Sequence, residues 1–315
     1  MEDYRKIIKF GKSSYVVSLP TDWVKRNKLE KGDSLFINEN LNNELVFNPR
    51  PFEGRAGKKQ ITIHIDGKDK SRIKREIVSA YLNNYNIIKT EGDTAKYGGY
   101  VRDAIKNLMA LEIVDENSKE IIAKDFLDLK EVTFEEIIRK IDTITKSMML
   151  DVKTIDGKGD SENLMQRDEQ INRLVYLIMR TMRFTLDNPG MANKKNLLKM
   201  TFILNVWDIT LNIEKIADDV KRAARHFSRV KSKKSMKGLL QLFGEIEKFY
   251  WDTMRAYYEG DIEKSYALSL SKRKLSDKCN EMHEIYWGER GVPVILENFK
   301  NMISSTHNIG RRVYS

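Results

Sequence analysis

The sequence predicts a multidomain α+β protein, and three observations along its 315 residues support that class. Short β-rich runs occupy residues 1–48, strands and helices alternate over 60–128, and long amphipathic helices fill 129–315. Residues 49–59 indicate a linker, because two prolines and two glycines interrupt them without a hydrophobic period. We therefore expect an N-terminal β domain, a small α/β middle module and a C-terminal all-α region.

The N-terminal 48 residues are expected to form two β-hairpins joined by a short helix. The expected elements are the strands Tyr4–Phe10 and Ser14–Leu19, a helix Thr21–Asn27, and the strands Ser34–Asn38 and Glu44–Phe47. Gly11 supplies the first turn, and Thr21 is the expected cap of the helix. Four strands this short cannot bury an adequate core alone, so a homodimer through this domain is the expected unit.

Basic side chains gather around the first strand and the short helix. Over the whole chain, Lys and Arg number 56 against 46 Asp and Glu, which gives a formal net charge of +10 and favours polyanionic partners. The candidate DNA-contacting residues are Arg5, Lys6, Lys9, Lys12, Ser13, Lys25 and Arg26. For any one of them, a solvated charge that only keeps the protein soluble is the alternative interpretation.

The same segment carries a family resemblance, through Lys9–Lys12, Ser18–Pro20, Trp23, Leu29 and Gly32-Asp33. These residues resemble the AbrB/MazE/SpoVT swapped-hairpin family, in which two chains interlock into one barrel and present basic residues to DNA. The resemblance implies that residues 1–48 form a swapped-hairpin β-barrel that is complete only in the dimer. Antitoxins share this barrel, so the fold alone does not name the regulated process.

Residues 60–128 predict a small α/β module. The expected elements are the strands Gln60–Ile65 and Ile87–Thr90, the helices Ser71–Asn84 and Tyr100–Ala110, and a pair of strands, Glu112–Val114 and Glu120–Ala123. The module contains no recognisable site chemistry in its sequence. Packing, or coupling between domains, is therefore its expected role.

Long helices follow from Thr133, where apolar residues step by three and four along the chain from Phe134 to Met148. The further helices expected are Asp160–Asp187, Asn193–Phe227, Met236–Tyr258, Asp261 to about Trp287, and Pro293–Val313. They form two sets of three, over about 129–228 and 235–315, and the similar segments GDSEN and GDIEK open the middle helix of each set. We therefore expect a duplicated pair of three-helix bundles.

Two carboxylates interrupt the apolar pattern of the third long helix. Glu214 and Asp218 continue a seam formed by Met200, Leu204, Trp207 and Leu211. Residues four apart share one helix face, so both carboxylates lie at or beside the packed side. Burying them without a partner would be costly, so a metal ion, a basic partner or a water-exposed groove must account for them.

Two stretches of this region carry a second resemblance. NIEKIADDVKRAARHF, Asn212–Phe227, resembles the third-helix signature of PhoU-type phosphate-uptake regulators, and RDEQINRL, Arg167–Leu174, resembles the preceding helix. In that family, two three-helix repeats carry acidic pairs that can hold metal clusters, and the domain reports on a phosphate transporter and a signalling pathway. The resemblance implies a sensor domain of the same kind over residues 129–315.

The resemblance also assigns candidate metal ligands. In the first repeat they are Asp168, Glu214 and Asp218, with Asn172 in place of a further carboxylate, and they would hold a divalent or iron-type ion. In the second repeat, Ser304 and Asn308 fall where acidic residues are due, which leaves Asp277 and Glu281 as an acidic pair. The alternative is structural: Glu214 pairs with neighbours on the Lys215 side or with Arg173 across the bundle, or meets solvent.

Several function classes are not supported by the sequence. No uninterrupted apolar run of about 18 residues occurs, and the first residues lack the apolar stretch of a secretory signal, so we expect a cytoplasmic protein without membrane insertion. Cys279 is the sole cysteine, which excludes an intrachain disulfide. No H-E-x-x-H, G-x-S-x-G or G-x-G-x-x-G motif occurs, and we expect no enzymatic activity.

Together these features predict a dimeric DNA-binding transcriptional regulator linked to phosphate uptake. Its helical domain would act as the sensor, with DNA and a phosphate transporter or signalling component as partners. Two alternatives stay open. One is a signalling adaptor of a phosphate transporter, in which the N-terminal domain serves only dimerisation, and the other is a carboxylate metal-binding bundle.

Overall fold

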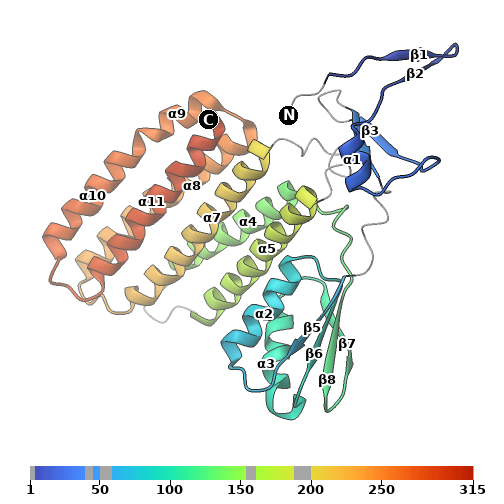
Figure 1. Ribbon diagram of the computed structural model, residues 1–315. Helices are drawn as coiled ribbons and strands as arrows, with labels where there is room; N and C mark the ends of the chain where they lie inside the picture. Colours follow the sequence, from blue (N-terminus) through green and yellow to red (C-terminus); the bar gives the residue numbers. More distant parts are fainter. Residues whose placement is uncertain (1–3, 40–44, 50–58, 154–160, 188–199, 315) are drawn as a thin grey trace. The chain divides into compact units, whose positions relative to one another are not determined.

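The computed structural model describes residues 4–39, 45–49, 59–153, 161–187 and 200–314. The chain divides into two compact units, Met1–Gly57 and Lys58–Ser315. Both contain the kinds of element that the sequence predicts, a mixture of helices and small sheets (Figure 1).

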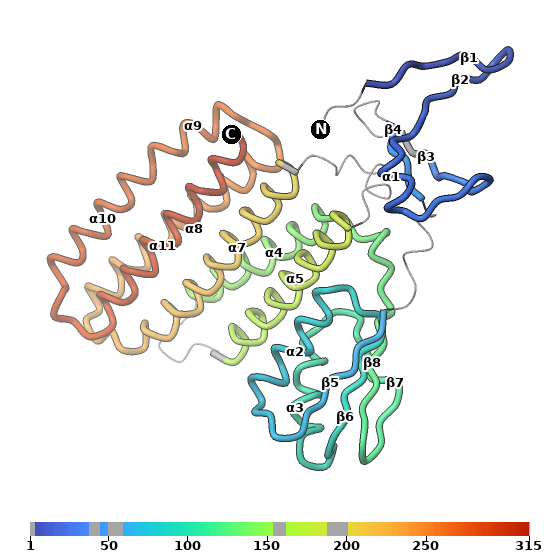
Figure 2. The backbone as a smooth tube through the Cα atoms, viewed as in Figure 1, coloured from blue at the N-terminus to red at the C-terminus, as the bar shows by residue number. Residues whose placement is uncertain are grey.

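Met1–Gly57 contains two antiparallel hairpins and one short helix, which can be followed in Figure 2. The first hairpin pairs β1 (Ile8–Phe10) with β2 (Ser14–Val16), α1 spans Thr21–Arg26, and the second hairpin pairs β3 (Phe36–Glu39) with β4 (Leu45–Asn48). The prediction that Thr21 caps the helix is wrong. Pro20 is the N-cap residue, in extended conformation and without a capping side chain, and Thr21 is already helical.

Residues 60–125 form a four-stranded sheet in the order β5-β6-β8-β7, with two helices against it. The elements are β5 (Gln60–His64), α2 (Lys70–Leu82), β6 (Ile87–Glu91), α3 (Thr94–Lys106), β7 (Leu111–Glu116) and β8 (Glu120–Asp125). β5 and β6 are parallel, whereas β8 is antiparallel to both of its neighbours. The helix predicted from Tyr100 begins earlier, at Thr94, because the Asp93 side chain caps it by accepting from the Lys96 N–H at 3.2 Å.

Buried side chains alternate along the central strands β6 and β8, and α2 and α3 contact each other as well as the sheet. Both helices therefore cover the same face. Ile73, Ile77, Ile88 and Ile121 are fully buried in the core between them. The opposite face lacks such a cover among the described elements of Lys58–Ser315.

The helical region contains two successive sets of helices in one continuous hydrophobic core. Its elements are α4 (Phe134–Lys153), α5 (Ser161–Asp187), α7 (Met200–Phe227), α8 (Lys233–Glu259), α9 (Ile262–Ser269), α10 (Ser271–Tyr286) and α11 (Val292–Tyr314). The helix predicted from Asp261 to about Trp287 is therefore two helices. The break is at Leu270, where the Ser269 hydroxyl donates to the Tyr266 carbonyl at 2.6 Å and competes with regular helix bonding.

The helices that end the two sets, α7 and α11, make the most extensive helix contact. They run antiparallel, since Asp208 pairs with Arg312 at 2.7 Å and Asn212 with Asn308 at 3.3 Å. The rings of Phe227, Phe243 and Phe299 lie together in the core that the two sets share. None of the described helices has the length and apolar character needed to cross a membrane.

A buried ion pair joins the α/β module to helix α5. The guanidinium of Arg180 bonds both carboxylate oxygens of Asp125 at the end of β8, and the two side chains are only 1% and 2% exposed. Arg180 also donates to the Asn84 side chain at 3.2 Å and lies 4.4 Å from the centre of the Tyr81 ring. Lys58–Ser315 is one compact unit, and this network links the end of the sheet to α5 within it.

Candidate nucleic-acid interface

The first hairpin has two chemically different faces. Its register pairs Ile8 with Val16 and Lys9 with Tyr15, and paired residues lie on the same face of the hairpin. One face therefore carries Ile8, Phe10 and Val16, and the other carries Lys9 and Tyr15. The tight turn between the strands is possible because Gly11 takes a positive φ of 69°.

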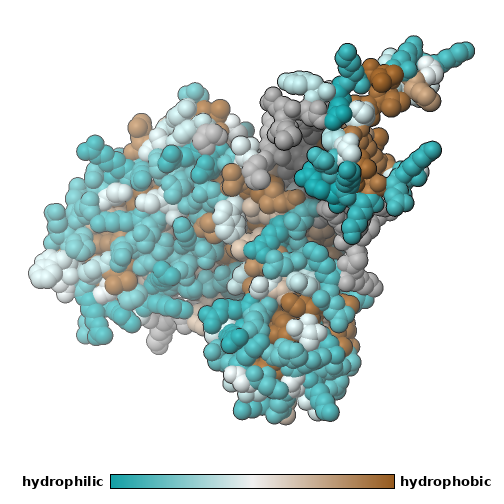
Figure 3. Space-filling model, in the orientation of Figure 1, coloured by the Kyte–Doolittle hydropathy of each residue, from teal (hydrophilic) through white to brown (hydrophobic). Residues whose placement is uncertain are grey.

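Apolar side chains of this unit lie open to solvent. No residue is buried over 4–37 and 45–49, whose side-chain environments are described. Phe10 and Tyr15 are each 70% exposed. The other exposed apolar residues of these ranges are Tyr4, Ile7, Ile8, Val16, Val17, Phe36, Ile37, Leu45 and Val46. Figure 3 shows brown, hydrophobic surface on this unit.

All seven predicted DNA-contacting residues are exposed. Arg5 and Lys6 precede β1, Lys9 lies in it, and Lys12 and Ser13 form its turn. Lys25 and Arg26 are in the last turn of α1, where cations also interact favourably with the helix dipole. Five of the seven thus lie in the first hairpin or just before it, and two lie at the end of α1.

The α1 end is held by local hydrogen bonds. The Asn27 side chain donates to the Trp23 carbonyl at 2.8 Å. Asp33 accepts from the Glu30 N–H at 2.7 Å, across a turn in which Gly32 has a φ of 101°. These contacts hold the backbone around the end of α1, next to Lys25 and Arg26, although none of the described residues of this unit is buried.

The predicted acidic cluster of the bundle is assembled, with a lysine inside it. The Lys221 ammonium lies 2.7 Å from Asp168 Oδ2 and 2.9 Å from Asp218 Oδ1, and Arg222 also pairs with Asp218. A basic partner, Lys221, is thus present for Asp168 and Asp218. Among the described residues, Glu214 forms no ion pair with Arg173; the charges that act on it are those of Asp218, Asp168, Lys221 and Lys215.

Burial, together with the carboxylates of Asp218 and Asp168, raises the pKa of Glu214. Burial opposes the charge of Lys221, but hydrogen bonds with Asp168 and Asp218 raise its pKa overall. In the part of the chain that the structure describes, no three His, Cys, Asp or Glu side chains are arranged to hold a metal ion. Metal binding by Asp168, Glu214 and Asp218 stays a prediction, and the ammonium already supplies part of the countercharge.

The seam used to place these carboxylates is not the buried stripe of α7. Leu204 is 56% exposed, whereas Val206, Ile213 and Val220 are buried. Glu214 and Asp218 therefore lie at the half-buried edge of the helix, where solvent lowers the cost of their charges. The sequence pattern missed the more deeply buried neighbour, Asp219, which is 5% exposed and whose pKa burial raises to about 6.

The acidic pair predicted in the second repeat is open to solvent. Asp277 and Glu281 lie exposed on α10, and among the described residues Asp277 pairs with Arg273 of its own helix, at 3.9 Å. Asn308 of α11 instead donates to the side chain of Asn212 in the first repeat. The two repeats thus meet through amide groups at this level.

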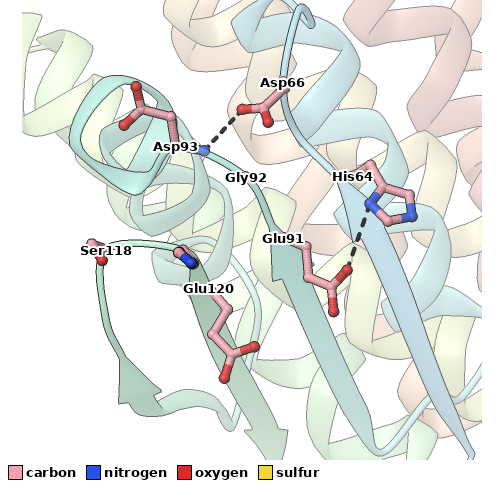
Figure 4. A pocket seen from close by; sticks show the side chains of 8 residues that line it. His64, Asp66, Glu91, Gly92, Asp93, Ser118 and Glu120 are labelled. Atoms are coloured by element: carbon pink, nitrogen blue, oxygen red, sulfur yellow. Dashed lines mark hydrogen bonds and ion pairs between the residues drawn. The ribbon is translucent and has the colours of Figure 1, made fainter.

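A cleft in the α/β module has no counterpart in the sequence-based prediction. It has a volume of about 710 Å³ and lies at the carboxyl ends of β5 and β6 (Figure 4). Its lining residues are His64, Asp66, Glu91, Gly92, Asp93, Ser118, Lys119 and Glu120. The sequence signal that could have indicated this cleft is the set of polar residues that follow two strands. Ligand sites commonly form at the carboxyl ends of parallel strands.

The cleft is shaped by one close approach of the backbone. Gly92 has a φ of 146°, and a Cβ there would lie 2.6 Å from Asp66 Oδ1, which accepts from the Asp93 N–H at 2.8 Å. His64 lies 3.6 Å from Glu91, and Lys89 bridges Glu91 and Glu120 at 3.0 and 2.7 Å. The lining is rich in carboxylates, and Lys89 offsets part of the charge of Glu91 and Glu120.

Comparisons with protein-family models, with curated proteins and with solved structures find no match to this chain.

Proposed function

We propose that this chain is a dimeric DNA-binding transcriptional regulator, in which the helical region acts as a sensor linked to phosphate uptake. The observation that carries the proposal is the combination found in Met1–Gly57. Apolar strand faces are exposed over the described part of this unit, and basic side chains surround the same hairpin.

Dimerisation follows from the energetics of these strands. Burying one Ile or Phe side chain contributes about 1.5–3 kcal/mol, and Ile8, Phe10 and Val16 together remain on one open face. A second copy of the same unit offers an equally apolar, self-complementary surface. Pairing two copies gives the short strands the shared core that one copy lacks, as the resemblance to swapped-hairpin proteins implies.

The opposite face suits a polyanion. Lys9 and Tyr15 share it, Lys12 and Ser13 lie in the adjoining turn, and basic residues of this kind bind phosphate oxygens without reading the sequence. Lys25 and Arg26 add two charges at the end of α1. In a dimer each group occurs twice, which gives a two-fold arrangement that matches a palindromic DNA site.

The link to phosphate rests on the resemblance of Arg167–Leu174 and Asn212–Phe227 to PhoU-type regulators. In the proposed mechanism, a signal that changes the bundle alters how the two N-terminal units engage DNA. Mapping of the genomic loci that the protein occupies, in high and in low phosphate, tests this link. Occupancy that does not respond to phosphate contradicts it and leaves the DNA-binding proposal intact.

DNA binding itself is tested by salt dependence. If the dimer neutralises about 6 to 10 phosphates, its affinity falls by on the order of 10³ to 10⁵ between 50 and 200 mM salt. Replacing Lys9 and Lys12 by Ala removes four positive charges per dimer, so it lowers affinity and flattens the salt slope by about 4. The matched control replaces the exposed Lys106 and Lys140 by Ala, and it should leave the DNA affinity and its salt slope unchanged. A Lys9 and Lys12 variant that binds DNA like the wild type contradicts the proposed surface.

A further inference from the structure

Positive charge is concentrated at one place in Lys58–Ser315. Residues 220–244 contain eight Lys or Arg and no Asp or Glu. Seven of the eight are exposed and define what we call the cationic end: Arg222, Arg225, Arg229, Lys231, Lys233, Lys234 and Lys237. The whole chain has a formal net charge of only +10, so this stretch of 25 residues accounts for most of it.

The cationic end has little internal compensation. Of its seven side chains, only Arg222 forms an ion pair with the residues that the structure describes, to Asp218. Lys233 and Lys234 occupy the first turn of α8, which contains no acidic residue, although the helix dipole disfavours cations there. Burial, with Arg229 and Arg225 nearby, also lowers the pKa of His226. An external anionic partner would relieve this local repulsion.

Exposed apolar side chains lie beside these charges. The turn between α10 and α11 packs onto the turn between α7 and α8, because Glu289 accepts from the Ser232 N–H at 2.9 Å and a Cβ at Gly291 would lie 3.2 Å from Arg229 Cβ. Both turns are at the same end of the bundle (Figures 1 and 2). The α10–α11 turn carries Trp287, which is 71% exposed, and Ile285 at the end of α10 is 68% exposed.

We propose that this end of the bundle docks on the surface of an anionic phospholipid bilayer. Each Lys or Arg near such a surface strengthens binding by about fivefold, and an exposed Trp is favoured at the boundary between headgroups and acyl chains. The cations supply electrostatic attraction to the lipid headgroups. Trp287 and Ile285 supply a shallow apolar insertion, so the surface combines two binding signals. Glu281 and Glu284 are exposed on α10 and the carboxylate of Glu289 lies against Ser232, but the seven cations outnumber these three acidic groups.

Apolar side chains decide between a membrane and a nucleic acid as the partner. The outer surface of a duplex, whose bases are stacked inside it, offers no apolar layer for both Trp287 and Ile285, whereas a bilayer surface does. The proposal is independent of DNA binding by Met1–Gly57. It would place the helical region at a membrane, although none of its described helices could cross one.

Co-sedimentation of the full-length protein with lipid vesicles tests the proposal. We expect binding to vesicles that contain phosphatidylglycerol, little binding to phosphatidylcholine alone, and weakening with rising salt. Replacing Lys231, Lys233 and Lys234 by Gln should lower the affinity by on the order of 10²-fold. Trp287→Ala should lower it further and abolish a vesicle-induced blue shift of the tryptophan emission.

The matched control replaces Lys74, Lys106 and Lys140 by Gln, three exposed lysines away from the cationic end, and should bind vesicles like the wild type. The Lys9 and Lys12 variant should do so too, which separates this surface from the proposed DNA surface. Equal binding to both vesicle types, or unchanged binding of the Lys231, Lys233 and Lys234 variant, overturns the proposal. If the Lys231, Lys233 and Lys234 variant binds vesicles like the wild type but binds DNA more weakly, the cationic end is assigned to nucleic acid instead.

Discussion

The hairpins of Met1–Gly57 and the sheet of the α/β module are built from similar apolar strands that differ in what covers them. In the sheet, Ile88 and Ile121 are fully buried beneath α2 and α3. In the first hairpin, Ile8 and Phe10 are 63% and 70% exposed. Because the sheet finds its cover within the same chain, its stability should not depend on protein concentration. In the proposed dimer a second chain covers the hairpin face, so folding of the hairpin should be coupled to association.

Phe10→Ala should give the largest effect of the changes considered. Removing a buried Phe costs about 3–5 kcal/mol, and a dimer loses two such side chains. We therefore expect dimerisation to weaken by on the order of 10⁴-fold or more. Sedimentation equilibrium over a dilution series measures this. The control is Phe126→Ala, since Phe126 is 60% exposed in the α/β module and should leave the dimer unchanged. A Phe10→Ala protein that stays dimeric at high dilution would show that this face is not the interface.

Asp125→Asn probes the opposite case, a contact made within one chain. It leaves the Arg180 guanidinium buried without its charged partner, which typically costs about 3–5 kcal/mol. Urea unfolding should show this loss at every protein concentration, and dimerisation through Met1–Gly57 should not change. Asp115→Asn, at an exposed site on β7, is the matched control and should stay within about 0.5 kcal/mol of the wild type. A loss that grows on dilution would contradict the assignment of this contact to a single chain.

The sequence patterns predicted the type of most elements, because hydrophobic period is a local property. They missed features that depend on distant positions. The Arg180–Asp125 pair joins residues far apart in the chain, and no local pattern indicates it. The cleft at the ends of β5 and β6 also depends on distant positions, because it forms only when these two strands pair in parallel. Lys221, by contrast, could have been found, because it lies three residues after Asp218 on the same helix.

Asp219→Asn tests the buried carboxylate that the pattern missed. Burial raises its pKa from 3.8 to about 6, so the folded protein binds the proton more tightly than the unfolded chain. Its contribution to stability is therefore complete below about pH 4 and is lost as pH rises to about 6, at a cost of roughly 3 kcal/mol at neutral pH. Asn removes this cost. We expect the difference in unfolding free energy between variant and wild type to rise from pH 4 to pH 7 in urea titrations. A difference that is constant with pH would contradict the raised pKa.

Lys221→Gln should have the smallest effect and bears on the two explanations of the acidic cluster. It removes hydrogen bonds to Asp168 and Asp218 at a site that is partly exposed, so we expect a loss of about 1–2 kcal/mol in unfolding free energy. The control is Lys215→Gln, at an exposed position of the same helix, which should leave the unfolding free energy close to that of the wild type. Metal analysis of the purified protein then separates the explanations. Stoichiometric metal in the wild type that is lost in a Glu214→Gln and Asp218→Asn variant would favour a carboxylate metal site. If the wild type contains no metal and Lys221→Gln destabilises it, the lysine is the countercharge of the cluster. Among the described residues, Lys221 is the cation that bridges Asp168 and Asp218.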